Sequence, residues 1–233
     1  MSDAIPVLLV LCLAAVFTLV PLRGPRRARR RCRETARDLR GDFRFRPIPR
    51  ARPLPELSSL PPFHYGRDRR TLDQVAGAFA GLPGEVFSYT CRENGTPQWY
   101  QVAVLRLGRA LPPIEVQHEP VFTSARVRYA PVDPRRDTGV PEFDSGYRAS
   151  SPDERLARTL ITPGLARTLL AAPEPCDWRV EGGLLVVWRR DGWSSGAALV
   201  GCCLAAVHAL APVLDLDPDQ FGAPRSNPGP ENG

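Results

Sequence analysis

The chain has 233 residues, of which 43% are hydrophobic, and a formal net charge of +6. That length is sufficient for one globular domain with a hydrophobic core. All 31 basic residues are arginine. The lack of lysine excludes P-loop nucleotide-binding proteins, pyridoxal-phosphate enzymes and protein kinases, because each of these classes needs a lysine at its site.

The positive charge belongs to one short segment. Between Arg23 and Arg52 there are thirteen arginines and only three acidic residues, a local net charge of +10 that leaves about −4 for the rest of the chain. A nucleic-acid-binding domain carries its basic face on the folded unit itself. We therefore expect no nucleic-acid partner.

An uncharged apolar stretch, Ile5–Leu22, precedes this basic segment. At about 18 residues it is close to the shortest helix that spans a bilayer. The first four residues hold no basic residue, so the stretch lacks the positive start of a cleaved signal peptide. Because arginines beside a span stay in the cytoplasm, the sequence predicts a single-pass anchor with its N-terminus outside and the remaining domain cytoplasmic.

The arginines directly after this span are the predicted membrane-surface residues. Because these arginines lie beside the span, they are expected to set its topology and to contact anionic lipid headgroups. The alternative role is the binding of a nucleic acid or of a specific acidic partner. The predicted contacts are Arg23, Arg26, Arg27, Arg29, Arg30 and Arg31.

Composition divides the chain into four expected parts. Residues 1–22 form the transmembrane anchor, and residues 63–216 form a soluble α+β domain. Residues 23–62 are expected as an arginine-rich juxtamembrane segment and a linker, since six prolines fall between positions 47 and 62. Residues 217–233, rich in proline, glycine and asparagine, are expected to be a disordered tail.

Strand patterns dominate the first half of the expected domain. Val86–Cys91 and the apolar stretch Trp99–Leu107 read as strands, and Asn94-Gly95 between them predicts a hairpin turn. Residues 72–79 fit a helix or a strand. Shorter strands are expected at residues 43–46, 114–116, 125–129 and 143–147, with Pro112-Pro113 ending the loop before the second of these.

Helix signals follow in the second half. Ser151 is expected to cap one short helix and Thr162-Pro163 to start another. Residues 178–188 predict a hairpin around Gly182-Gly183. Ser194 or Ser195 should cap a last helix that ends near Pro212, too short for a second membrane span and therefore a packed C-terminal core helix. The predicted fold is an antiparallel sheet of six to eight strands with these helices.

Catalytic and metal motifs are not found in the sequence. His64, His118 and His208 lie far apart, and the six cysteines include no CxxC pair, so free thiols are expected. Carboxylates such as Asp73, Glu115 and Asp144 could meet in space, but no pattern marks them. We predict no catalytic, cofactor-binding or metal residue and no cofactor. Among the aromatic residues, Trp99, Tyr100, Trp178 and Trp188 are predicted as core, whereas Trp193, in a turn, is a possible contact for a protein partner.

Several short motifs resemble an uncharacterised family of single-pass membrane proteins from actinomycete-type, high-GC bacteria. They include Phe43-Arg-Phe45, the run at residues 61–67, Leu111-Pro-Pro-Ile-Glu-Val116, Ser151-Pro-Asp153 and Trp178-Arg-Val-Glu-Gly182. The resemblance implies no assigned activity and no functional residue. It does favour a strand at residues 72–79.

The function predicted from these features is a membrane-tethered cytoplasmic interaction or scaffold module with an unknown protein partner. Two alternatives stay open: a small-ligand-binding sensor with a site between sheet and helix, and a hydrolase-type enzyme that uses scattered Asp, Cys and His residues.

Overall fold

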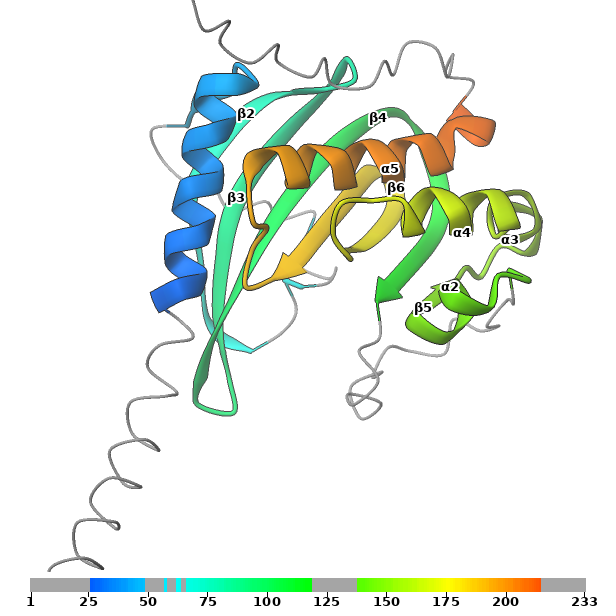
Figure 1. Ribbon diagram of the computed structural model, residues 1–233, viewed down its shortest axis with the longest axis horizontal. Helices are drawn as coiled ribbons and strands as arrows, with labels where there is room; N and C mark the ends of the chain where they lie inside the picture. Colours follow the sequence, from blue (N-terminus) through cyan, green and yellow to red (C-terminus); the bar gives the residue numbers. More distant parts are fainter. Residues whose placement is uncertain (1–25, 49–56, 58–61, 64–65, 119–137, 215–233) are drawn as a thin grey trace, which may run out of the picture.

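A computed structural model describes residues 26–48, 57, 62–63, 66–118 and 138–214 (Figure 1). Residues 26–42 are helical and are called the arginine helix below. The strands are β1 (Arg46–Pro47), β2 (Arg67–Phe79), β3 (Leu82–Glu93), β4 (Thr96–His118), β5 (Tyr147–Ser150) and β6 (Asp177–Arg190). The other helices are α2 (Pro141–Gly146), α3 (Glu154–Leu160), α4 (Pro163–Leu170) and α5 (Gly196–Leu214).

The strands form one antiparallel sheet in the order β1-β2-β3-β4-β5, and β6 pairs with β4. The predicted α+β class with an antiparallel sheet is therefore confirmed. Residues 72–79 belong to strand β2, and Asn94 and Gly95 form the β3–β4 turn with φ angles of 50° and 79°. The predicted transmembrane span, the strand at residues 125–129 and the tail lie outside the described residues.

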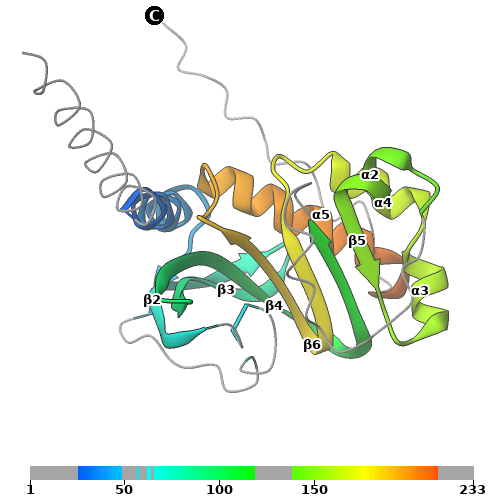
Figure 2. The same ribbon diagram turned by 90° about the horizontal axis from the view of Figure 1, so that it is seen from below.

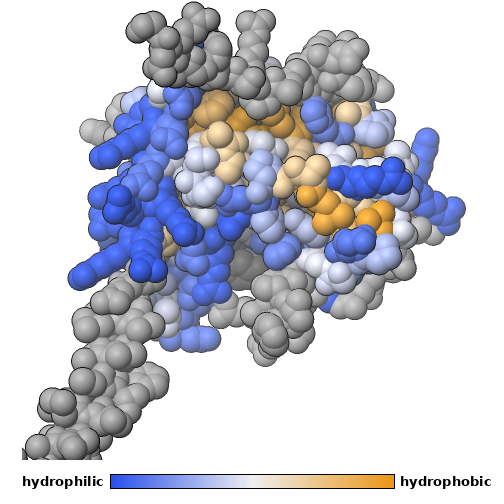
Figure 3. Space-filling view, viewed as in Figure 1, coloured by the Kyte–Doolittle hydropathy of each residue, from blue (hydrophilic) through white to orange (hydrophobic). Residues whose placement is uncertain are grey.

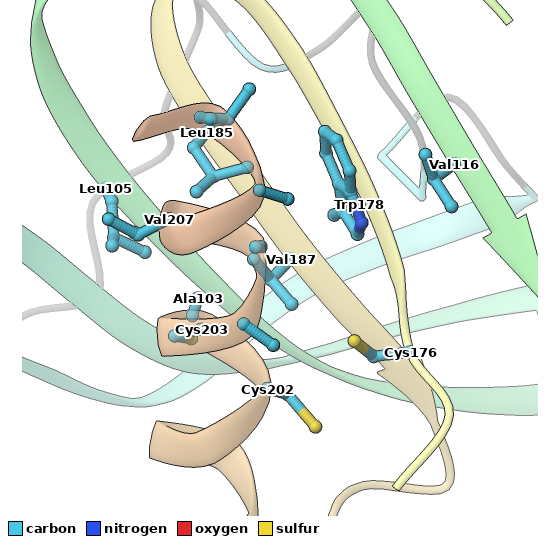
Figure 4. Close-up of a cluster of buried hydrophobic side chains, with 14 of the residues drawn as sticks. Ala103, Leu105, Val116, Cys176, Trp178, Leu185, Val187, Cys202, Cys203 and Val207 are labelled. Carbon is cyan, nitrogen blue, oxygen red and sulfur yellow. The ribbon is translucent and has the colours of Figure 1, made fainter. Parts of the chain in front are cut away.

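Strand β6 doubles back on itself. Its 14 residues would span roughly 45 Å if straight, yet the Arg189 guanidinium near its end donates to the carbonyl of Pro175, which precedes its start, at 3.1 Å. The bend lies at Gly182, whose φ is 58°, and Figures 2 and 4 show the two arms side by side. The hairpin predicted around Gly182-Gly183 is thus confirmed.

Strand β4 bends in the same way and encloses this hairpin (Figure 2). Its first arm pairs with the second arm of β6, from Tyr100 with Arg190 to Arg106 with Leu184. Its second arm, from Ile114 to Val116, pairs with the first arm of β6. The register shifts twice between the arms, around Gly108 with its φ of 72°. The predicted strand at residues 99–107 is therefore central, as expected.

Each face of the sheet carries its own hydrophobic cluster. Helix α5 covers one face. Leu105, Trp178 and Val187 lie beneath it and are 0% exposed (Figure 4). On the other face, strand residues form a second cluster together with Leu57 and Phe63, which lie outside the strands and are 1% and 8% exposed. Leu57, which belongs to the proline-rich stretch that we expected to be a linker, is therefore packed on the sheet.

Helix α5 is the one helix of the described chain long and apolar enough to cross a membrane. Most of its residues are nevertheless buried inside the fold, as expected for a packed core helix. The Ser195 hydroxyl accepts a hydrogen bond from the amide of Ala198 at 3.1 Å, so the predicted cap is present. Pro212 lies within the helix, which ends at Leu214.

Two local predictions are wrong. Residues 143–147, predicted as a strand, belong mostly to helix α2, because Pro141 suits a first helical turn and Phe143 is buried. Helix α3 is capped by Asp153, whose carboxylate accepts from the Leu156 amide at 2.8 Å. The predicted cap, Ser151, donates instead to the carbonyl of Pro113 at 2.7 Å. Helix α4 has the predicted cap, Thr162.

The β6 hairpin can be tested at its turn. Gly182→Ala should lower the free energy of unfolding by about 1–2 kcal/mol, because a side chain strains a positive φ. The matched control is Gly183→Ala, whose added Cβ meets only ordinary contacts with Arg109 at 3.6 Å. Urea unfolding of both variants measures the difference in their free energies of unfolding. Equal losses of stability in the two variants would contradict a turn at Gly182.

Candidate functional site

The arginine helix is docked onto the domain by a narrow stripe of small and apolar residues. Ala28, Cys32, Thr35, Ala36 and Leu39 are each no more than 2% exposed, and they recur at the spacing of one helix face. Leu39 belongs to the main hydrophobic core. The sequence predicts this segment outside the domain; its burial places residues 26–42 within the folded unit.

Polar contacts fix the same helix to the start of α5. The Asp38 carboxylate accepts a hydrogen bond from the Gly196 amide at 3.1 Å, which places a negative charge at the positive end of α5. The side chain of Gln101 donates to the Cys32 carbonyl at 3.2 Å. These bonds join the helix to both the sheet and α5.

Two glycines permit this close approach. A Cβ added at Gly196 would lie 2.7 Å from the Cβ of Asp38, and one at Gly192 would lie 3.0 Å from the Cys32 sulfur. Gly192 also has a φ of 76°. The two helices therefore pack at a separation that larger residues would not allow.

Trp193 does not face a partner. Its side chain is 0% exposed, and its carbonyl lies 3.5 Å from the donating hydroxyl of Thr35. The prediction of an exposed partner contact is therefore wrong. The turn that holds Trp193 is covered by the arginine helix. The sequence predicts that Trp193 lies in a turn, but it does not predict which distant segment packs over that turn.

The outer side of the arginine helix is strongly cationic. Residues 26–42 contain eight arginines and three acidic residues, and two of these acids are engaged, Glu34 with Arg30 at 2.7 Å and Asp38 with Gly196. Figure 3 shows the resulting hydrophilic surface along the helix. The predicted membrane-surface residues Arg26, Arg27, Arg29, Arg30 and Arg31 are all exposed on it, and Arg23 lies outside the described residues.

One exposed arginine also contacts an aromatic ring. The Arg29 guanidinium lies 6.0 Å from the centre of the Trp99 ring, within range of a cation–π interaction. Trp99 is half-buried, whereas the other predicted core residues Tyr100, Trp178 and Trp188 are buried.

A second group of ionisable residues lies where the bent arms of β4 and β6 meet. Glu115 and Arg179 form an ion pair at 2.9 Å. Asp177, which the sequence did not mark, accepts a hydrogen bond from the His118 amide at 2.7 Å. Burial, together with the nearby Glu115, raises the pKa of Asp177 to about 7 against the lowering effect of the His118 amide. These contacts join neighbouring arms of the sheet, which is typical of structural ionic groups.

The other candidate residues are separate from this group. The Asp144 carboxylate accepts from the Thr138 hydroxyl at 2.8 Å, and Asp73 lies on β2. Cys32, Cys91, Cys176, Cys202 and Cys203 are free and buried. Burial raises the pKa of Cys32 to about 12 and that of Cys91 to about 11, so both thiols are protonated at neutral pH. Within the described ranges, no cluster of His, Cys, Asp and Glu is arranged to hold a metal ion.

Comparison with known proteins gives one likeness in fold. No family model matches the sequence, and no curated protein matches it. Among solved structures, the chain is similar to the crystal structure of the mycobacterial trehalose monomycolate transport factor A. The TM-score is 0.50 and the identity 14%, over 80% of this chain and 92% of that one. The likeness is one of fold, and its mycobacterial source agrees with the resemblance to proteins of actinomycete-type bacteria.

The docking of the arginine helix can be tested at Asp38. Asp38→Ala should lower the free energy of unfolding by about 1 kcal/mol, because the Gly196 amide loses its acceptor at the start of α5. The exposed Asp42 provides the control: Asp42→Ala removes the same charge from the same helix without touching α5. Equal destabilisation in chemical unfolding would show that Asp38 does not hold the helix.

The burial of Asp177 predicts a pH-dependent stability. The pKa of Asp177 is raised from 3.8 to about 7, so its protonated carboxyl favours the folded state. This contribution to the free energy of unfolding is complete below about pH 4 and is lost as the pH rises to about 7. Asp177→Asn should remove this decline. Urea unfolding between about pH 4 and about pH 8 measures it, and parallel curves for the variant and the unchanged chain would contradict the burial.

Proposed function

We propose that this protein is a membrane-tethered interaction module with a role related to transport. The observation that carries the proposal is the docking of the arginine helix, which makes the segment next to the predicted anchor part of the folded domain.

The anchor itself is predicted from the sequence. Three residues separate the end of Ile5–Leu22 from Arg26, the first described residue of the helix. In the proposed arrangement, the anchor therefore holds a rigid domain close to the bilayer, and the arginines that follow it keep that domain on the cytoplasmic side.

The arginines at the start of the helix are proposed to contact anionic headgroups. Arg26, Arg27, Arg30 and Arg31 are exposed and lie within two turns of the proposed membrane exit. A basic residue near an anionic membrane contributes about 1 kcal/mol of attraction. Such contacts would restrict the tilt of the domain in addition to setting its topology.

The link to transport comes from the similar structure. That protein is described as a transport factor, and this chain shares its fold over most of both lengths. Fold alone does not carry an activity to another chain. The proposal for this protein is therefore limited to assistance of a transport process at the membrane through contacts with other proteins.

The tether can be tested by removing residues 1–22. The full chain should stay in the membrane fraction after an alkaline carbonate wash, whereas the shortened chain should move to the soluble fraction, because the arginines alone give salt-sensitive binding. A full chain that the carbonate wash releases would refute the tether.

Topology is tested separately, on intact cells that express the full chain. With Cys12 replaced by serine, an Arg225→Cys variant should resist a membrane-impermeant thiol reagent in intact cells and react after lysis. The five described native cysteines are buried and give little background. Labelling in intact cells would place the domain outside.

A further inference from the structure

Five arginines form a straight row on the side of the arginine helix that faces away from the domain. Arg26, Arg30, Arg33, Arg37 and Arg40 recur at alternating steps of four and three, which keeps them on one helix face. All five are exposed, and Figure 3 shows hydrophilic side chains projecting along this edge of the molecule.

Among the residues that the structure describes, the far part of this row has no neutralising carboxylate partner. Arg30 pairs with Glu34 at 2.7 Å, but no described carboxylate pairs with Arg33, Arg37 or Arg40. Arg40 donates only to the Ala36 carbonyl of its own helix, at 3.1 Å. Like charges at this spacing repel one another. The docking of the opposite face holds these charges together.

The row has a near part and a far part, which differ in their distance from Arg26 along the helix axis. At a rise of 1.5 Å per residue, Arg33, Arg37 and Arg40 lie roughly 10, 16 and 21 Å beyond Arg26. Attraction to lipid headgroups decays over about 8 Å at physiological ionic strength. In a chain whose helix leads away from the bilayer, the far arginines are beyond the reach of the headgroups.

We infer that Arg33, Arg37 and Arg40, the distal arginine row, bind an acidic segment of a partner protein. The inference rests on the proposed function, to which it adds the chemistry of the partner. A partner helix with carboxylates at positions i, i+4 and i+7 reproduces the spacing of the row. Each guanidinium can bind such a carboxylate with two parallel hydrogen bonds.

The test uses the full chain in nanodiscs of phosphatidylcholine, which carry no net charge. The probe is a fluorescein-labelled helical peptide with glutamates at i, i+4, i+7 and i+11, compared with the same peptide carrying glutamines. Fluorescence anisotropy at an ionic strength of about 0.15 M, where the field of the headgroups is screened within about 8 Å, should show binding of the acidic peptide alone. Arg33→Gln with Arg37→Gln should weaken that binding by roughly fivefold or more.

The matched control is Arg155→Gln with Arg167→Gln, two exposed arginines on α3 and α4. This pair removes the same charge elsewhere and should change the affinity by less than about twofold. Equal weakening by both pairs, or no binding of the acidic peptide by the unchanged chain, would overturn the inference.

A second arm separates a protein partner from the membrane. Nanodiscs that contain phosphatidylglycerol should still bind the acidic peptide, since the distal row stands away from the surface. Loss of binding there would mean that headgroups occupy the row, and it would overturn the inference. The carbonate wash reports on the tether independently, so a failure of either proposal can be recognised by itself.

Discussion

The contact between the arginine helix and the start of α5 is the interaction on which the rest of the structure depends. Asp38 accepts from the Gly196 amide, and glycine at positions 192 and 196 lets the backbones approach. The same contact buries Trp193 and completes the core through Leu39. One side of an arginine-rich segment thereby becomes structural, and only its other side is available for lipids or partners.

The nested hairpins of β4 and β6 provide the platform for this contact. Because β6 folds back between the two arms of β4, the sheet offers a broad face to α5. Burying a large apolar side chain contributes roughly 1.5–3 kcal/mol, and residues such as Trp178 and Leu199 are fully buried there. The opposite face is closed in part by Leu57 and Phe63. Both faces are thus occupied by elements outside the sheet.

Local signals in the sequence were sufficient for the two glycine turns and for two of the three predicted helix caps. Asn94-Gly95 and Gly182-Gly183 predict hairpins because few other residues adopt a positive φ, and Thr162-Pro163 predicts a helix start. The docking of residues 26–42 was missed because the arginines conceal the buried stripe that includes Cys32 and Leu39. The burial of Asp177 and Trp193 depends on segments distant in sequence, and no local pattern reports them.

The central claim is that the arginine helix is a fixed part of the domain in the full chain. Spin labels at Arg37→Cys and Arg155→Cys, with Cys12 replaced by serine, can be attached selectively because the other cysteines are buried. Pulsed electron paramagnetic resonance in nanodiscs then measures the distance between the helix and α3. A single narrow distribution is predicted. A broad distribution would show that the helix moves independently of the domain and would contradict the account.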